Sequence, residues 1–373
     1  MIKTEKWEKV FLGEIADEII ERIDNPSQSG FELFVGLEHF ISGDLKIKQW
    51  GSTKNLVSAM KKFQKGDILF ARRNAYLKRS SIVQFDGVCS GDAFVIREKK
   101  DRLVPGFLAF IFNSESLWNY ANSYAAGTMS KRVKWRDLAK YSFKLPPLNE
   151  QKRLAGLLWS VDEVIEKYNI VFSTLDCLCK IYAFQEFSEN NNKCIFLKET
   201  IELFKGKQPN KLYSDSKEGR LPYLTTDYIR NGISRFVDVS SVDENNLTDN
   251  SDILLLWDGS NAGETFLGYC GVVASTMAKI KIVANEVLPE YLYFYLRLNE
   301  DVIKRARIGS AIPHVSADFL LHLKFPVKKL NDQQKFVNKI NDFENQKNIV
   351  NSSNIILRKV QKQIINQIFG GKS

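Results

Sequence analysis

The sequence lacks the features that would place the protein in a membrane or outside the cell. None of its apolar runs approaches the ~18–20 residues of a membrane-spanning helix. The amino-terminal stretch MIKTEKWEKV has no hydrophobic segment of the kind that signal peptides carry. The 5 cysteines are scattered without a CxxC pair, and the 3 histidines are not spaced to complete a zinc site. We therefore expect a cytoplasmic protein with buried, reduced thiols and no bound metal.

Catalytic signatures are equally scarce. The sequence has no Gly-x-Gly-x-x-Gly dinucleotide loop and no Asn-Pro-Pro-(Tyr/Phe) or Asp-Pro-Pro-Tyr motif of amino-methyltransferases. Gly370-Gly-Lys-Ser373 resembles the end of a phosphate-binding loop, but no strand precedes it and no helix follows it. Asp67, Asp92 and Asp252 could belong to a nuclease site, although Asp67 and Asp252 better fit a turn before a strand. We predict a chain without catalytic residues; a self-sufficient nuclease or methyltransferase is the alternative from another class.

What the sequence does contain is an ordinary globular composition with an excess of positive charge. Of its 373 residues, 44% are hydrophobic and 26% are charged. This length is enough for two or more domains with sizeable cores. The formal net charge of +9 and the pI near 9.1 fit a nucleic-acid or other anionic partner.

The chain repeats itself in order along its length. The phrase at Pro146–Leu154 returns at Lys328–Phe336, and Phe11–Glu14 returns at Phe196–Glu199. Because the matches keep their order at a nearly constant offset, we conclude that the chain contains two copies of one unit. Further matched pairs are 34–43 with 223–232, 65–70 with 250–255, and 127–130 with 309–312.

Each copy has the same predicted plan, an α+β fold in which a mainly-β domain precedes a long helix. Short apolar runs broken by Gly, Asn, Asp and Ser predict the strands. One helix opened by proline interrupts each copy, at Pro105–Tyr120 and Pro289–Arg307. The predicted strands are Asp67–Ala71, Ser81–Phe85 and Ala93–Arg97, then Asp252–Trp257, Gly271–Ala274 and Ala278–Val283. The predicted divisions are domain 1–145, helix 146–190, domain 191–328 and helix 329–373.

Both long helices carry a heptad seam, which is typical of a helix packed lengthwise against another. In the second helix the polar residues Lys347, Asn354 and Gln361 interrupt the seam. Forty residues at 1.5 Å each make roughly 60 Å, longer than one small domain covers. We therefore predict an antiparallel coiled coil that relates the copies by a pseudo-twofold axis, rather than helices packed on their own domains. The expected seam residues are Leu154, Leu158, Val161, Ile165, Phe172 and Leu175 with Phe336, Ile340, Phe343, Val350, Leu357 and Ile364.

Two basic loops in the first copy, at 71–79 and 129–136, combine cations with aromatic and amide side chains. Such side chains bind phosphates and read guanine or adenine edges in a major groove, although a solvated basic surface has the same composition. The matched loops of the second copy, at 256–264 and 312–317, differ in sequence, as expected of two readers with different targets. The candidate DNA contacts are Arg72, Arg73, Asn74, Tyr76, Lys78, Arg79, Ser130, Lys131, Arg132 and Lys134, then Trp257, Ser260, Asn261, Arg305, Arg307, Ser310 and His314.

The chain as a whole resembles the specificity subunits of type I restriction–modification systems. Its most specific marker is Leu145-Pro-Pro-Leu-Asn-Glu-Gln-Lys152, which opens the first long helix. The strand at Gly66–Arg72 and the segment at Gly127-Thr128 are typical of the family's target recognition domains. The second copy departs from the pattern, since Pro326–Gln333 lacks the double proline and has Asp in place of Glu.

The resemblance implies two target recognition domains, held in inverted orientation by two antiparallel helices, that each read half of a bipartite DNA sequence. A spacer of roughly 60 Å exceeds the ~34 Å of one duplex turn, so the helices would set the unread gap. It also implies that two methyltransferase subunits dock on this chain and supply S-adenosylmethionine chemistry for DNA methylation and phage defence. Restriction subunits would add ATP- and Mg-dependent translocation and cleavage, while this chain holds no cofactor. A type IIB specificity subunit and a coiled-coil scaffold without a DNA role are the remaining alternatives.

Overall fold

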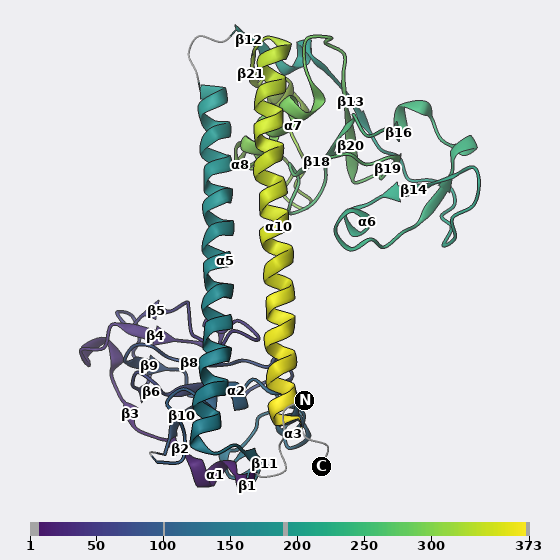
Figure 1. Cartoon of the computed structure of the whole chain (residues 1–373). Helices are drawn as coiled ribbons and strands as arrows, with labels where there is room; N and C mark the ends of the chain where they lie inside the picture. Colours follow the sequence, from purple (N-terminus) through teal and green to yellow (C-terminus); the bar gives the residue numbers. More distant parts are fainter. Residues whose placement is uncertain (1–6, 100, 189–192, 371–373) are drawn as a thin grey trace. The chain divides into compact units, whose positions relative to one another are not determined.

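A computed structural model describes residues 7–99, 101–188 and 193–370. Its contacts divide the chain into two compact units: unit 1 comprises Met1–Ile170 with Asn351–Ser373, and unit 2 comprises Val171–Val350. Two long helices, α5 (Leu148–Ser188, 41 residues) and α10 (Leu330–Phe369, 40 residues), contribute a segment to each unit (Figure 1). Each unit therefore joins a β-rich domain to parts of both long helices.

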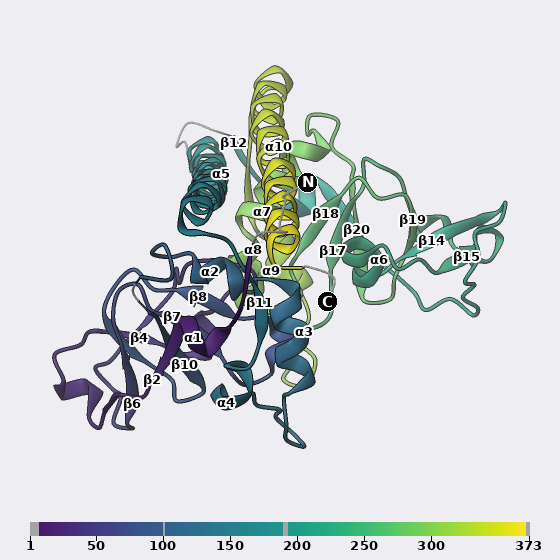
Figure 2. The same cartoon turned by 60° about the horizontal axis from the view of Figure 1, so that its bottom comes forward.

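Unit 1 contains two sheets and a short ribbon, which Figure 2 shows beside α3 (Glu115–Ser123) and α4 (Trp135–Leu138). One sheet has the order β2 (Ala16–Ile19), β10 (Ala93–Glu98), β7 (Ile68–Ala71), β8 (Ser80–Ile82). The other has the order β3 (Arg22–Ile23), β6 (Met60–Phe63), β9 (Gly87–Cys89), β4 (Leu33–Val35), β5 (Gly51–Ser52). The ribbon pairs β1 (Glu8–Phe11) antiparallel with β11 (Ser142–Leu145), directly before α5.

Unit 2 repeats this topology, except that its second sheet has four strands and no counterpart of β3. Its first sheet has the order β13 (Ile201–Lys205), β20 (Met277–Ile282), β17 (Ile253–Leu256), β18 (Thr265–Leu267). Its second has the order β15 (Phe236–Asp238), β14 (Arg220–Leu224), β19 (Gly271–Val273), β16 (Leu247–Thr248). The ribbon pairs β12 (Lys193–Phe196) with β21 (Lys324–Val327). Each unit also has one parallel pair, β4 with β9 and β14 with β19, so the duplicated α+β fold is confirmed.

The helix predicted inside each copy is broken into two. Unit 1 has α2 (Leu108–Ile111) and α3, and unit 2 has α7 (Pro289–Leu298) and α8 (Glu300–Arg305). In unit 1 the break follows from Asn113, whose Nδ2 donates to the Ala109 carbonyl at 2.9 Å, and from Ser114, which caps α3. In unit 2 Asn299 does the same toward the Tyr295 carbonyl at 2.9 Å. The remaining short helices are α1 (Leu12–Ile15), α6 (Thr226–Asn231) and α9 (Ala317–Leu321).

A buried glutamine explains the repeated phrase at the start of α5. Gln151 is 1% exposed, and its Oε1 accepts a hydrogen bond from the Val104 amide at 3.0 Å. Its Nε2 donates to the carbonyls of Arg102 at 3.1 Å and Pro146 at 2.8 Å. The side chain thus fastens the first turn of the helix to the loop that leads into α2.

Gln333 occupies the same position in α10 and makes the same set of bonds. It is fully buried, and its Oε1 accepts from the Leu288 amide at 2.9 Å. Its Nε2 donates to the carbonyls of Glu286 and Lys328, both at 2.7 Å. The sequence motif is repeated because both helices begin with the same three hydrogen bonds from a buried glutamine.

Within unit 1, α5 and α10 pack antiparallel through a seam that includes polar side chains. The Nδ2 of Asn354 donates to Asn169 Oδ1 at 2.6 Å, and the Nε2 of Gln361 donates to the Leu158 carbonyl at 3.4 Å. Both are buried in the seam rather than turned away from it. Of the expected seam residues, Leu154, Leu158 and Ile165 are buried, and Val161, Leu357 and Ile364 are partly buried.

Within unit 2 the pairing is also antiparallel. Buried Lys347 places its Nζ 2.8 Å from Asp176 Oδ1 on α5, and the ring of Tyr182 stacks on Phe336 with centroids 5.5 Å apart. Phe172 is 37% exposed, unlike the buried seam residue that its spacing suggests, because Lys347 takes the seam beside it with Nζ 5.6 Å from the Phe172 ring. Of the other expected seam residues, Phe336 and Ile340 are buried, and Leu175, Phe343 and Val350 are partly buried.

The cysteines only partly follow the expectation of burial. Cys89 and Cys179 are buried, whereas Cys177, Cys194 and Cys270 are exposed, so the burial prediction is wrong for these three. Cys177 lies on an outward face of α5, and Cys194 lies in a two-stranded ribbon. Within the described ranges, no three or more His, Cys, Asp or Glu side chains gather in a way that could hold a metal ion. No helix in those ranges is long and apolar enough to cross a membrane.

Candidate nucleic-acid interface

The two basic loops of the first copy lie side by side in unit 1. The backbone amide of Asn74 donates to the Lys131 carbonyl at 2.9 Å, and the backbone amide of Val133 donates to the Arg72 carbonyl at 2.9 Å. Arg73 and Arg132 form an isolated antiparallel bridge between the same segments. Candidate residues that are distant in the sequence therefore form one surface at the end of β7.

Asp92 organises the arginines of this surface. Its carboxylate accepts from Arg132 Nε at 2.9 Å and Nη2 at 3.3 Å. Arg73 Nη1 lies 3.8 Å and Arg72 Nε 4.0 Å from the same carboxylate. The hydrogen bond from Arg132, with the charges of the other two arginines, holds the pKa of Asp92 below its ordinary range. One carboxylate thus holds Arg132 by hydrogen bonds and lies within ion-pair distance of Arg73 and Arg72, so the surface keeps an excess of positive charge.

The loop after β7 has an unusual backbone. Asn74 and Lys78, which flank the 3₁₀ turn Ala75–Leu77, have φ angles of 55° and 50°. Left-handed conformations are unfavourable for residues other than glycine and persist where the surrounding structure enforces them, often at functional sites. The turn leaves the Tyr76 side chain 66% exposed.

The other candidates of unit 1 divide between held and exposed side chains. Arg79 is held, because its Nη1 donates to the Leu37 carbonyl at 3.0 Å and burial lowers its pKa. Ser130 accepts a hydrogen bond from Arg73 Nε. Lys131 and Lys134 are exposed, and neither forms an ion pair with any residue that the structure describes. These two lysines are therefore available to an anionic partner.

The corresponding loops meet in unit 2 through the same backbone frame. The Val315 amide donates to the Trp257 carbonyl at 3.0 Å, and the Gly259 amide donates to the Pro313 carbonyl at 2.8 Å. Asp258 and His314 form the isolated bridge that matches Arg73 and Arg132. The frame is thus shared while the side chains that it presents are different.

The candidates of unit 2 present an indole, hydroxyls, an amide and few cations. Arg307 Nη1 donates to the Ser260 carbonyl, which ties the segment after α8 to the loop at 256–264. Lys205, which the sequence reasoning missed, lies 3.0 Å from Asp258 Oδ2 and 5.9 Å from the centroid of Trp257. Its sequence position gave no signal, because it ends strand β13 rather than lying in a candidate loop. The exposed candidates here are Ser260, Asn261, Arg305 and Ser310.

The matched aspartates before the central strands serve the frame. Asp67 is buried and accepts from Arg97 Nε at 2.7 Å and Nη2 at 2.8 Å, as well as from the Gln64 amide at 2.9 Å. Asp252 accepts from the Asp249 amide at 3.2 Å, and burial raises its pKa. Both carboxylates cap the turn before a strand, the structural role that their sequence context favours.

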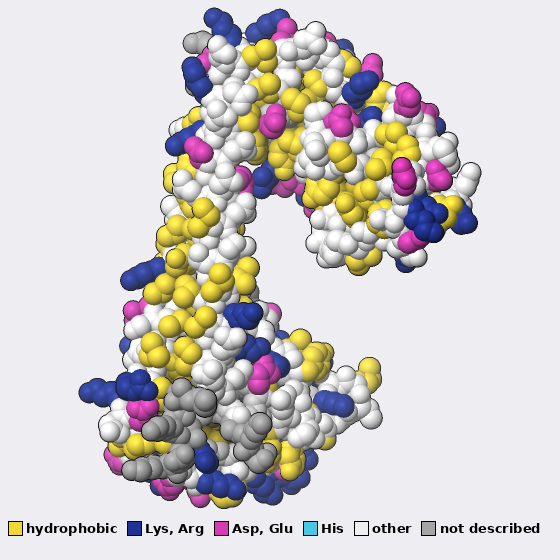
Figure 3. Space-filling view, turned by 45° about the vertical axis from the view of Figure 1, so that its right-hand side comes forward, with side chains coloured by type: hydrophobic (Ala, Val, Ile, Leu, Met, Phe, Trp, Pro, Cys, Tyr) yellow, Lys and Arg dark blue, Asp and Glu magenta, His cyan; other side chains and the backbone are white. Residues whose placement is uncertain are grey.

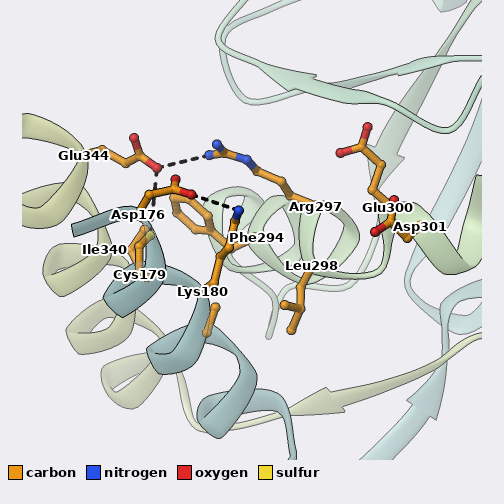
Figure 4. A pocket seen from close by; sticks show the side chains of 11 residues that line it. Asp176, Cys179, Lys180, Phe294, Arg297, Leu298, Glu300, Asp301, Ile340 and Glu344 are labelled. Carbon is orange, nitrogen blue, oxygen red and sulfur yellow. Dashed lines mark hydrogen bonds and ion pairs between the residues drawn. The ribbon is translucent and has the colours of Figure 1, made fainter. Parts of the chain in front are cut away.

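A hollow of about 540 Å³ lies in unit 2 between α5, α7 and α10 (Figure 4). Its charged side chains bind one another: Arg297 Nη1 lies 3.3 Å from Glu344 Oε1, and Lys180 Nζ lies 2.8 Å from Asp176 Oδ2. The first pair joins α7 to α10, whereas the second lies within α5. The hollow is thus a gap where these helices pack, lined by side chains that already pair with one another.

Comparison with known proteins gives consistent matches. A family profile described as "Type I restriction modification DNA specificity domain" matches residues 4–170 and 189–358. The chain is 37% identical over 171 residues to the type I restriction enzyme MjaVIII specificity subunit of Methanocaldococcus jannaschii. That alignment covers 45% of this chain and 40% of the relative, so it spans less than half of the relative's length.

Two solved structures share the fold over the whole chain. One, from work on complex assembly and conformational transition of a type I restriction–modification system, has a TM-score of 0.62 at 20% identity and covers 99% of both chains. The type I specificity subunit from M. genitalium has a TM-score of 0.61 at 16% identity and covers 100% of this chain and 99% of that one.

Proposed function

Because the chain belongs to the type I restriction modification DNA specificity family, we propose that it is the DNA-recognition subunit of a type I restriction–modification complex. The recognition domain of unit 1 reads one half of a bipartite target, and that of unit 2 reads the other. The observation that carries this proposal is the shared loop frame: the same two loops meet in both units and present different side chains. A backbone frame shared by both copies, with loops that differ in side chains, suits two readers of different sequence.

The chemistry of the unit 1 surface supports DNA contact. Arginine can bind guanine O6 and N7 in a bidentate way, and exposed lysines bind phosphates. Arg132 is pre-oriented by its hydrogen bonds to Asp92, and Arg73 by its hydrogen bond to Ser130, which limits the entropy lost on binding. Lys131 and Lys134 supply sequence-independent affinity, which falls as salt rises. Unit 2 reads its half with fewer cations, through Trp257, Asn261 and the neighbouring polar groups.

The long helices fit a role as a docking platform and spacer. Exposed apolar residues lie on both helices within unit 1, as the apolar side chains along the helices in Figure 3 illustrate. Apolar patches of this kind mark protein–protein contacts. We infer that two methyltransferase subunits dock there and that the helices set the number of unread base pairs. On the long helices of unit 1, the exposed large apolar residues are Leu148, Leu157, Val164 and Ile170 on α5 with Ile355, Ile356 and Val360 on α10.

The catalytic groups then belong to the partners. The methyltransferase subunits bring S-adenosylmethionine, and restriction subunits bring the sites for ATP and Mg. This chain contributes recognition and assembly in the cytoplasm, without catalytic residues of its own.

Exchange of one recognition domain tests the proposal. Residues 1–145 are replaced by the matching domain of another family member, and adenine methylation is mapped by sequencing in cells that also express the partner subunits. One half of the methylated target should change, while the other half and the gap are retained. The matched exchange of residues 191–328 should change the opposite half. An unchanged target after both exchanges would refute the proposal.

A further inference from the structure

A basic hollow lies in unit 1, where α10 meets the recognition domain. Its volume is about 350 Å³, and Ser42, Gly43, Asn113 and Trp118 form part of its wall. The charged residues around it are Glu115 and four cations: Lys78 from the candidate DNA loop and Arg358, Lys359 and Lys362 from α10.

Acidic side chains orient these cations without neutralising them. Glu115 Oε1 lies 2.6 Å from Lys362 Nζ, and its other oxygen pairs with Lys78 Nζ. The hydrogen bonds from Lys362 and then Lys78 lower the pKa of Glu115. Arg358 Nη1 lies 2.6 Å from Asp44 Oδ1, while Lys359 is exposed and forms no ion pair within the described part of the chain. Four positive charges thus face two carboxylates, which leaves an excess of two (4 − 2).

The hollow is built on rigid contacts. The backbone amide of Glu115 donates to Asn366 Oδ1 at 2.9 Å, and Ser116 Oγ donates to the Phe369 carbonyl at 3.0 Å. Trp118 and Ile365 are buried beneath it. A charged site held by packed elements loses little entropy when it binds a ligand.

The hollow is also continuous with the candidate interface. Lys78 ends the 3₁₀ turn that presents Tyr76, and its ammonium reaches across to the carboxylate that Lys362 shares. An anion seated in the hollow would therefore touch both the recognition loop and α10.

We propose that this hollow binds a phosphodiester group of the DNA backbone, so that the spacer helix α10 contacts DNA itself. The proposal rests on the proposed function, since the duplex is the target that unit 1 reads. Ammonium groups clustered around a small hollow suit a phosphate oxygen, and such contacts fix the position of a protein on the duplex without reading its sequence. The proposal adds Lys359 and Lys362 to the candidate DNA contacts.

The test compares Lys359→Gln and Lys362→Gln with Lys152→Gln, an exposed lysine near the start of α5 that does not line the hollow. DNA binding by the full chain, assembled with its methyltransferase subunits, is measured from about 50 to about 200 mM salt. Each hollow variant should lower the slope of log affinity against log salt by about one. The affinity ratio of wild type to variant should then change about 3.5-fold over that range. The methylated sequence should stay the same.

Glu115→Gln supplies a variant with the opposite sign. Removing the carboxylate makes the net charge of the hollow more positive, because Lys78 and Lys362 lose their shared anion. DNA binding should therefore tighten at low salt. Slopes for Lys359→Gln and Lys362→Gln that equal the slope of Lys152→Gln would overturn the proposal. So would slopes that stay at the wild-type value in variants that have lost binding of inorganic phosphate, because the hollow would then hold free phosphate and not the DNA backbone. If the wild-type assembly shows no sequence-selective binding, the proposed function fails instead.

Discussion

Replacing Gln151 with leucine should destabilise unit 1 without changing the fold or the net charge of the unit. The substitution removes three hydrogen bonds and leaves the Val104 amide and the carbonyls of Arg102 and Pro146 without their partner. Because Gln151 is 1% exposed, water cannot replace these bonds without opening the helix start. A buried polar group that loses its partner costs about 1–3 kcal/mol, so the total loss over the three groups should be roughly 3–9 kcal/mol. Gln333→Leu should cost a similar amount in unit 2, since the three bonds recur there.

Urea unfolding followed by circular dichroism measures the loss, and hydrogen exchange locates it. The Val104 amide should lose protection in Gln151→Leu, and the Leu288 amide should lose it in Gln333→Leu. Gln334→Leu is the matched control, because Gln334 is exposed and its Nε2 donates to Asn338 Oδ1 at 2.9 Å on the same helix. That change should stay within about 0.5 kcal/mol of wild type. A loss below about 1 kcal/mol in Gln151→Leu, with Val104 still protected, would refute the reasoning.

Two further predictions concern titration and reactivity. Hydrogen bonds from Lys180 and Lys347 lower the pKa of Asp176 to about 2, so its stabilising contribution is full above the ordinary carboxyl pKa of about 4 and is lost as pH falls through about 2. The difference in urea midpoint between wild type and Asp176→Asn should therefore shrink over that window, and a difference that persists at the acid end would contradict the pairing. Burial raises the pKa of the Cys89 thiol to about 12, so maleimide at about pH 8 should modify exposed Cys177 in the native chain and reach Cys89 after denaturation. Equal native rates at the two thiols, read by mass spectrometry, would show that Cys89 is accessible.

The duplication and the long helices could be predicted from the sequence because their signals are local. The heptad spacing and the phrase around Gln151 and Gln333 survive in the primary structure. The candidate loops could also be located, since cations and aromatics cluster in them. That the loops at 71–79 and 129–136 form one surface could not be predicted, because it depends on strand order and register.

The partners of individual side chains could not be predicted from the sequence either. Asp92 has no charged neighbour in sequence that marks it as the organiser of Arg132, Arg73 and Arg72. The break before α3 depends on Asn113 reaching the Ala109 carbonyl, which competes with a continuous helix. Lys347 reads as an interruption until its partner Asp176 on the other helix is known. Each of these features needs the three-dimensional neighbour.

The polar seam also decides which helices can associate. The repeat places Arg358 of α10 where α5 has Asp176, and Ile165 of α5 where α10 has Lys347. If α10 paired in the same way with α10 of a second chain, Lys347 would face Arg358, and two like charges would meet in the seam. If α5 paired with a second α5, Asp176 would face Ile165 and keep only Lys180 of its two cation partners. Pairing of α5 with α10 instead places Lys347 against Asp176. The differences between the two copies therefore disfavour homodimers with two identical readers. They favour one asymmetric molecule, which suits the non-palindromic target that two different readers would have.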